Sequence, residues 1–432
     1  MVKQKITFLA VGSRGDLNPA CALGGKLLSL GYKVCIATHD NFKSYVESKN
    51  LEFAPIAGNF KELLSSEAGL QFLEGKKQKF RIVNDELYYQ QLKDAYAAAI
   101  NSDALIIFPL SLFGYHIAEK LNIPYIFSSF VPLTSTREFP FLRFDLQNRY
   151  WFLSFLNRFS YDVAGFISWQ TNRTLINKFR KEVLGLNPVG FFGVEFRRNA
   201  PKNFKWENIP ILYQYSSRVI PTPQDWSQKN IYVTGNWFLA EEDDFSPSTE
   251  LLKFLNEGSK PIYIGFGSMT LRNPRHIFEL IVNAIKETKQ RAIIAASWSG
   301  MGEFVSDNKN IYVANEYIPY SWLFEKMRIL IHHGGSGTTA LALKSGVPQI
   351  VIPFTTDQPV WARKMVNLGV ASEFISIHDL NQDNLKEAIF STLNNDDLKP
   401  NAESIGASIR EEKGVELAAK LVTKLIGDFY EN

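Results

Sequence analysis

The stretch of sequence that decides the fold reads Ile329-Leu-Ile-His-His-Gly-Gly-Ser-Gly-Thr-Thr-Ala340. Its first four residues, 329–332, are a short isoleucine-rich run that predicts a buried strand. A glycine-rich turn follows, and residues 339–345 predict a helix. A strand, a tight turn and a helix in this order are typical of a βαβ unit in a parallel sheet.

The same alternation extends over most of the chain. Toward the N-terminus it predicts strands at 5–12, 33–37, 104–108 and 125–127 and helices at 17–31 and 113–121. After Ile220 the pattern restarts, with strands at 261–266, 292–296, 311–313, 329–332 and 349–353 and helices at 274–289, 339–345, 358–368 and 402–429. The sequence therefore predicts an α/β fold with two doubly wound parallel sheets. We expect a first domain over 1–215, a linker over 216–235, where Pro221 and Pro223 interrupt the pattern, and a second domain over 236–410.

The composition of the 432 residues, 45% hydrophobic and 21% charged, is that of a globular protein and excludes a disordered or collagen-like chain. No apolar run approaches the ~18 residues of a membrane span. Two cysteines, Cys21 and Cys35, exclude a disulfide framework and predict a reducing, cytoplasmic location. No Cys/His cluster has zinc-ligand spacing, so we expect no metal site.

Charge and aromatic residues are unevenly distributed. Residues 1–215 carry 26 basic and 18 acidic side chains, a balance of +8, and residues 216–432 carry 21 and 26, a balance of −5. Residues 137–169 interleave phenylalanine, tyrosine and tryptophan with arginine. This segment has two interpretations: helices that cover the first sheet, or an apolar acceptor pocket or membrane-surface face. We expect no nucleic-acid partner.

Three glycine-rich turns follow predicted strands and open helices, at residues 12–16 (GSRGD), 265–269 (GFGSM) and 332–339 (HHGGSGTT). Helix N-termini offer free N–H groups to anions, and glycine lets the backbone approach a phosphate. In the third turn His333 can donate to a phosphate oxygen and Thr338 adds a hydroxyl. Together the turns predict a diphosphate ligand.

The third turn also matches a different fingerprint. Gly335-x-Gly337-x-x-Ala340 has the spacing of a dinucleotide-binding turn, and Asp357 lies 20 residues beyond Gly337, near the expected ribose-binding acid. A nicotinamide-dependent oxidoreductase is therefore an open alternative at this point. Against it, Asp357 falls after the predicted strand and not at its tip, and two adjacent histidines have no role in that fingerprint.

Five motifs in order along the chain resemble a family-1 glycosyltransferase, above all the sterol glucosyltransferases and the antibiotic (macrolide and glycopeptide) glycosyltransferases. They are 12–19 (GSRGDLNP), 265–269 (GFGSM), 318–324 (IP followed by WLF), 332–339 (HHGGSGTT) and 353–361 (PFTTDQPVW). The resemblance implies a GT-B fold, with two facing Rossmann-like domains, the cleft between them, and a C-terminal helix over 411–432 that returns to the first domain. It also implies that the first domain binds the acceptor and the second a nucleotide sugar.

The resemblance further implies roles for individual residues. An acidic side chain at the position of Asp16 acts as general base toward an acceptor hydroxyl, although Asp16 is also a candidate N-cap for a helix from Leu17. Backbone around Ile318 would hold uracil, and Asp357 and Gln358 would hold sugar hydroxyls. The residues expected around the diphosphate are Ser13, Arg14, Gly15, Gly267, Ser268, His333, Gly335, Ser336, Gly337 and Thr338.

The resemblance therefore implies an inverting, metal-independent transfer of a hexose, expected to be glucose, from a UDP-sugar to a hydroxyl of an apolar acceptor, with a β-glycoside as product. UDP-sugar is a co-substrate here, and no further cofactor is expected. Sterol, terpenoid, carotenoid or polyketide acceptors suit the aromatic segment, and peripheral contact with a membrane surface is a further expectation. Tyr320 and Ser321 depart from the branch pattern at the nucleotide edge, which leaves TDP-sugar as an alternative donor.

Overall fold

The computed structural model describes residues 4–76, 83–146, 154–193, 209–227, 229–240 and 245–431. The chain divides into two compact units. The first comprises Met1–Leu63, Lys79–Leu239 and Lys413–Asn432, and the second comprises Leu64–Gln78 and Ala240–Glu412. Residues 147–153 of the aromatic segment lie outside the described residues.

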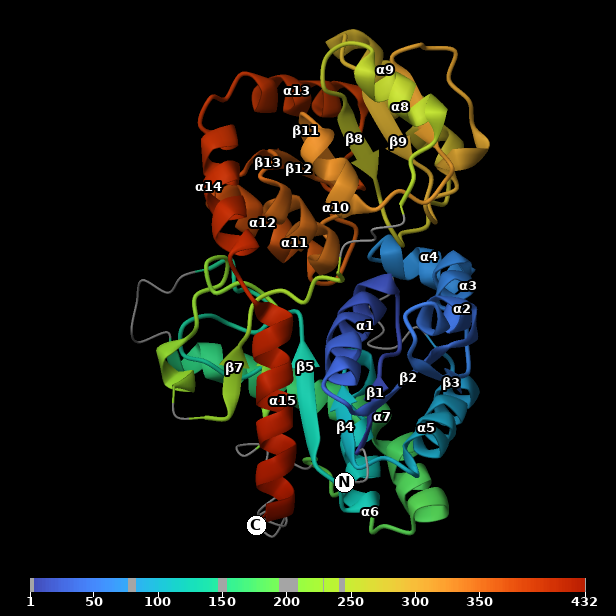
Figure 1. The fold of residues 1–432 in the computed structure, drawn as a ribbon, viewed down its shortest axis with the longest axis vertical. Helices are drawn as coiled ribbons and strands as arrows, with labels where there is room; N and C mark the ends of the chain where they lie inside the picture. The colour runs from blue at the N-terminus through green and yellow to red at the C-terminus, as the bar shows by residue number, and fades with distance from the viewer. Residues whose placement is uncertain are drawn as a thin grey trace. The chain divides into compact units, whose positions relative to one another are not determined.

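The first unit is built on a seven-stranded parallel sheet in the order β3-β2-β1-β4-β5-β6-β7 (Figure 1). Its strands are β1 Lys5–Leu9, β2 Lys33–His39, β3 Glu52–Ile56, β4 Ala104–Ile107, β5 Tyr125–Ser129, β6 Ile211–Tyr213 and β7 Ile231–Val233. Its helices are α1 Arg14–Ser29, α2 Lys43–Glu47, α3 Phe60–Ser65 (which runs into the second unit), α5 Asp85–Ala99, α6 Gly114–Leu121, α7 Ser154–Phe179 and α15 Gly414–Glu431.

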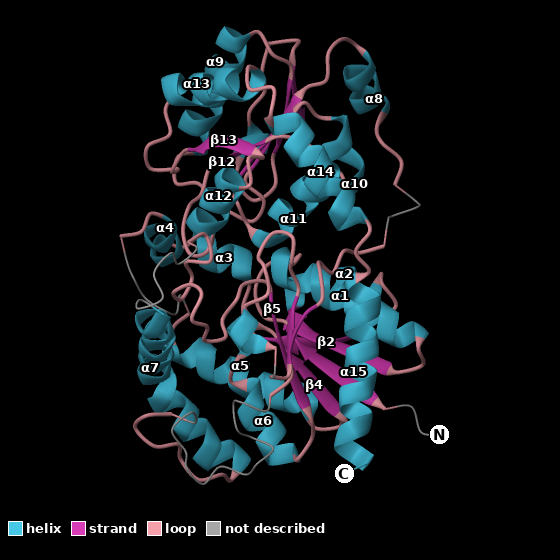
Figure 2. Cartoon of the chain, turned by 90° about the vertical axis from the view of Figure 1, so that its left-hand side faces the viewer, coloured by secondary structure: helices cyan, strands magenta, loops and turns pink. Residues whose placement is uncertain are grey.

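The strands at the centre of this sheet are buried on both faces. Ile6, Phe8 and Leu9 of β1 and Leu105 and Ile106 of β4 have no exposed surface. Continuous apolar runs of this kind are what a parallel sheet covered by helices on both sides requires. The C-terminal helix α15 packs beside α1 as part of that cover (Figure 2).

The second unit has a six-stranded parallel sheet in the order β10-β9-β8-β11-β12-β13. Its strands are β8 Ile262–Gly265, β9 Ala292–Ala295, β10 Ile311–Ala314, β11 Ile329–His332, β12 Gln349–Val351 and β13 Ala371–Phe374. Its helices are α4 Glu67–Leu73, α8 Thr249–Asn256, α9 Pro274–Thr288, α10 Tyr320–Leu323, α11 Ser336–Ser345, α12 Gln358–Asn367, α13 Gln382–Leu393 and α14 Leu398–Arg410. The predicted pair of doubly wound parallel sheets is confirmed.

The single helix expected over 402–429 is wrong, because the structure has two helices, α14 and α15, with a break between Arg410 and Gly414. At Gly414 the backbone of the first unit comes very close: a Cβ there would lie 2.3 Å from the carbonyl oxygen of Asn236. The chain therefore needs a residue without a side chain where it returns to the first unit, and glycine also interrupts a helix.

No helix in the described ranges is both long and apolar enough to cross a membrane. The two cysteines are free and buried. Burial raises the pKa of the Cys21 thiol to about 12 and that of the Cys35 thiol to about 11, so both stay protonated and unreactive near neutral pH.

Candidate active site

The two central glycine-rich turns of the second unit follow adjacent strands of its sheet. Strand order reverses between β8 and β11, and both strands end where these turns begin. Open α/β sheets bind ligands at the carboxyl ends of their strands at such a switch point. The loops after β8 and β11 are therefore placed together where a ligand is expected.

His333 lies between glycines from both loops. A Cβ on Gly267 would lie 2.7 Å from its Cε1 atom, and a Cβ on Gly335 would lie 2.4 Å from its Nε2 atom. The ring is buried and its Nδ1 has no hydrogen-bond partner within the part of the chain that the structure describes. Burial, with the neighbouring His332 as a lesser cause, lowers the pKa of His333 to about 3. His333 is thus a neutral imidazole that can donate one hydrogen bond.

The preceding residue, His332, has a structural role, because both of its ring nitrogens have partners within the protein. Its Nδ1 accepts a hydrogen bond from the Gly334 N–H at 3.1 Å, and its Nε2 lies 2.9 Å from Oε1 of Gln349. Burial lowers the pKa of His332 to about 4. Because its ring is held by the strand next to it, His332 fixes the turn at Gly334, where φ is +81°.

Helix α11 begins immediately after this turn with its N-terminus uncapped by any side chain of the described residues. Gly335 is the N-cap, and Ser336, Gly337 and Thr338 form the first turn. The N–H groups of a first helical turn lack intrahelical acceptors and carry the positive end of the helix dipole. This end can therefore bind an anion, with the Ser336 and Thr338 hydroxyls beside it.

The loop after β12 joins the same cluster through Gln358. The Gln358 side chain accepts from the Phe354 N–H at 2.9 Å and donates from Nε2 to the Met269 sulfur at 3.3 Å. It thereby connects the loop after β12 to the loop after β8. The role of Gln358 toward a sugar hydroxyl stays a prediction, because both ends of its side chain serve these loops here.

Asp357 is the N-cap residue of α12 and is half-buried. Its carboxylate accepts hydrogen bonds from the Trp361 Nε1–H and the Thr356 hydroxyl, each at 2.9 Å. Burial raises the pKa of Asp357, and these hydrogen bonds oppose that rise. Asp357 lies six positions beyond the end of β12, which is not where a ribose-binding acid of the dinucleotide fingerprint belongs.

Ile318 is buried in the core of the second unit, together with Tyr263, Leu323 and Phe324. Tyr320, at the departure noted above, stacks on Phe324 with ring centroids 4.6 Å apart. The aromatic residue at this position is therefore explained by packing. The expected contact of the Ile318 backbone with a base stays a prediction.

In the first unit the turn after β1 is held by a capping box. Ser13 is the N-cap of α1 and accepts from the Gly15 N–H at 3.1 Å, while the Asp16 carboxylate accepts from the Ser13 N–H at 3.0 Å. The prediction that Asp16 is itself the N-cap of a helix from Leu17 is wrong, because the helix begins three residues earlier, at Arg14. Asp16 occupies the third helical position, and its carboxyl reaches back to the cap.

Two other side chains near this turn are occupied within the first unit. The Arg14 guanidinium lies over the Tyr45 ring at 4.9 Å from the centroid. His39 is buried, its Nδ1 lies 3.2 Å from the carbonyl oxygen of Ile56, and burial lowers its pKa. His39 is therefore a neutral histidine of the core.

Two residues that support these loops were not among the predicted site residues. Gln349 contacts His332, and Met269 contacts Gln358, in the loops described above. The only local signal was Gln349, a polar residue inside the apolar run of β12. Within the described ranges, no group of three or more His, Cys, Asp or Glu side chains could hold a metal ion.

Comparison with known proteins identifies the family. Residues 6–140 match the glycosyltransferase family 28 N-terminal domain, and residues 288–423 match the erythromycin biosynthesis protein CIII-like C-terminal domain. Two sterol 3-beta-glucosyltransferases of Arabidopsis thaliana are 32% and 31% identical over 99% and 96% of this chain. The chain belongs to the sterol glucosyltransferase-like GT-B glycosyltransferases. It spans 66% and 67% of those two relatives, and a third of a 33% identical sterol 3-beta-glucosyltransferase of Pichia angusta.

Solved structures confirm the GT-B fold of this glycosyltransferase family member. The glycosyltransferase of kitacinnamycin superposes with a TM-score of 0.69 at 17% identity, covering 98% of this chain and all of that one. CalG4, the calicheamicin glycosyltransferase, gives a TM-score of 0.66 at 16% identity and covers 99% of each chain. At these identities the likeness concerns the fold. Family membership replaces the nicotinamide-dependent alternative.

Proposed function

We propose that this chain transfers glucose from UDP-glucose to a hydroxyl of an apolar, sterol-like acceptor, with inversion at the anomeric carbon. The observation that carries the proposal is the uncapped N-terminus of α11 beside His333 at the switch point of the second sheet. A buried nitrogen without a partner is costly unless a ligand supplies one. Relatives named sterol 3-beta-glucosyltransferases support glucose and a sterol as the substrate classes.

The donor would lie on the second unit. Ser268, His333, Ser336, Gly337 and Thr338 would surround the diphosphate, Ile318 the base, and Asp357 and Gln358 the sugar. The helix N-terminus and the neutral His333 would stabilise the negative charge that develops on the leaving diphosphate, without a metal ion.

The proton of the reaction would go to Asp16. As the acceptor oxygen forms its bond to the anomeric carbon, the bond from that carbon to the diphosphate oxygen breaks and UDP leaves with the electron pair. The carboxylate of Asp16 takes the hydroxyl proton. The hydrogen bond from the Ser13 N–H fixes one oxygen of this carboxylate and so orients it. Single displacement from an α-linked donor gives a β-glycoside.

The experiment that tests the proposal measures thermal shift and UDP release with UDP-glucose, TDP-glucose and NADH, with and without a panel of sterols and polyphenols. UDP release that requires a sterol, and a β-anomeric coupling in the product, are the expected results. Preference for TDP-glucose would replace the donor assignment, and an α-linked product would overturn the inverting mechanism. Release with polyphenols alone would replace the acceptor class.

An apolar stripe on α7 supports membrane-surface contact as part of the same proposal. Phe155, Phe159, Val163 and Ile167 recur every fourth residue and are exposed, Phe155 by 72%. An exposed apolar helix face can insert at a lipid headgroup boundary. Flotation with anionic vesicles should fall for Phe155→Asp with Phe159→Asp and not for Val305→Asp, an 88% exposed control in the second unit. Equal flotation of both variants would refute the contact.

A further inference from the structure

A short segment from the first half of the sequence packs within the second unit. Its described part, residues 64–76, contains α4, and we call it the α4 arm. Ser66 caps α4 by accepting from the Gly69 N–H at 3.2 Å. The arm is therefore a locally ordered element and not an extended connection.

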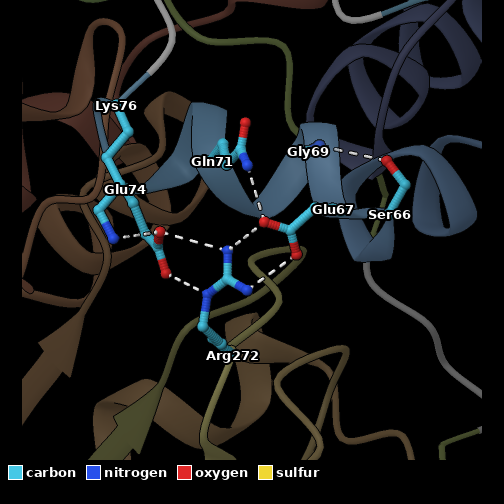
Figure 3. Close-up of polar contacts among 7 residues, drawn as sticks. All are labelled: Ser66, Glu67, Gly69, Gln71, Glu74, Lys76 and Arg272. Carbon is cyan, nitrogen blue, oxygen red and sulfur yellow. Dashed lines mark hydrogen bonds and ion pairs between the residues drawn. The ribbon is translucent and has the colours of Figure 1, made fainter.

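Arg272 binds the α4 arm through the carboxylates of Glu67 and Glu74 (Figure 3). The guanidinium donates from Nη1 and Nη2 to both oxygens of Glu67, at 2.9 and 3.1 Å, and from Nε to Oε1 of Glu74 at 2.6 Å. A fourth, longer bond joins Nη2 to Oε2 of Glu74 at 3.3 Å. Gln71 donates to Glu67 at 2.8 Å, and the Lys76 ammonium lies 3.0 Å from Glu74. One planar fork thus holds two carboxylates at fixed positions.

A second contact joins the same two segments of the chain. The buried Thr270 hydroxyl donates to the carbonyl oxygen of Leu64 at 2.9 Å. Thr270 and Arg272 both lie between β8 and α9, in the loop that also contains Gly267 and Ser268. The other end of this loop is held by the Trp298 N–H, which donates to the Gly267 carbonyl at 3.2 Å. The arm therefore supports the half of the loop that follows Ser268.

We propose that Arg272 is a positioning residue: by clamping the α4 arm, it holds the loop 266–273 so that Ser268 meets the donor diphosphate. The role of Ser268 in this proposal rests on the proposed function. The clamp is not explained by global stability, because the Arg272 side chain is 44% exposed and the Glu67 side chain 63%, and exposed ion pairs contribute little. What the fork contributes is geometry, which a lysine at the same position would not reproduce.

The test compares Arg272→Lys, Arg272→Ala and Thr270→Val with Arg275→Ala. Arg275 is the matched control: it lies in the first turn of α9, makes a long ion pair with Glu279 at 3.8 Å, and lies 4.8 Å from the centroid of the Phe304 ring. Hydrogen exchange of the loop 266–273 is measured in each variant, together with UDP affinity and the KM values for UDP-glucose and acceptor. Circular dichroism and the unfolding midpoint show that each variant is folded.

The expected result is faster exchange of the loop in both Arg272 variants and in Thr270→Val, and no change in Arg275→Ala. UDP affinity should fall by up to about fivefold in Arg272→Lys, the most that an exposed ion pair can contribute, while the acceptor KM stays constant. Unchanged loop exchange would overturn the clamp, and faster exchange with unchanged UDP affinity would overturn the positioning role. If the unmodified protein binds no UDP, the proposed function fails, and the exchange data still decide the clamp.

Discussion

Gly335→Ala tests whether the packing of His333 controls donor binding. Gly335 has an ordinary backbone, with φ −61° and ψ 140°, so alanine introduces no backbone strain. Its Cβ would lie 2.4 Å from Nε2 of His333, whereas ordinary van der Waals contact begins at 3.4 Å. The ring must therefore retreat by about 1 Å, the difference between these two distances. Overpacking of this kind costs about 1–3 kcal/mol of unfolding free energy.

A displacement of this size also has a functional cost, because a 1 Å misplacement can cost up to about a hundredfold in activity. Urea unfolding gives the change in stability, and calorimetric titration with UDP gives the change in affinity. We expect Gly335→Ala to be destabilised and to bind UDP at least about tenfold more weakly. Wild-type UDP affinity in a folded Gly335→Ala variant would refute the placement of His333 against the donor. Wild-type stability would refute the steric argument itself.

Three further predictions concern other parts of the molecule. Asp16→Asn should lower kcat by about 10²–10⁴ with unchanged UDP affinity, because the amide oxygen can still accept the capping hydrogen bond but cannot take a proton; unchanged turnover would remove the assigned role. Arg180→Met should lower the unfolding free energy by about 3–5 kcal/mol, since the fully buried Arg180 side chain forms an ion pair with the Glu119 carboxylate at 2.6 Å. A much smaller decrease of the unfolding free energy in urea would contradict this. Hydrogen bonds from Arg272 lower the pKa values of Glu67 and Glu74. The clamp should therefore persist above the ordinary carboxyl pKa and be lost as pH falls through the lowered values, seen as faster loop exchange.

Local patterns predicted the elements well where a single rule decides them. The strand over 329–332 matches β11 because a strand buried on both faces needs a continuous apolar run, here Ile329 to Ile331, and the buried His332 ends it. Helix starts were placed late: α1 begins at Arg14 and not Leu17, and α11 at Ser336 and not Thr339. In both cases glycine and serine at the cap and in the first turn resemble a loop, and only the cap geometry shows where the helix begins.

Contacts between residues far apart in the chain could not be predicted from the sequence. Arg272 and Glu67 are 205 positions apart, and nothing local to either residue marks the pairing. The arrangement around His333 is similar, because the need for glycine at position 267 arises from a ring that follows a different strand. The glycine-rich turns can be recognised in the sequence. Only the pairing of β8 with β11 shows that the His333 ring is the neighbour that leaves no room for a side chain.

Glycine is present at different positions of the third turn, residues 332–339, for different physical reasons. Gly334 has φ +81°, and a side chain on Gly335 would meet His333, so the protein's own packing requires both. Gly337 is different: its backbone is helical, and a Cβ there would meet no atom within 4 Å. Glycine in a helix costs up to about 1 kcal/mol relative to alanine, so the chain carries an unfavourable residue that its own fold does not need.

A ligand that approaches the backbone at Gly337 would supply the missing reason. Gly337→Ala should therefore raise the unfolding free energy by up to about 1 kcal/mol and weaken UDP binding, opposite signs that no general damage to the fold would produce. Urea unfolding and UDP titration on the same preparation measure both. If the variant is stabilised and binds UDP as tightly as the unmodified chain, the diphosphate does not approach the first turn of α11, and the donor site has to be placed elsewhere.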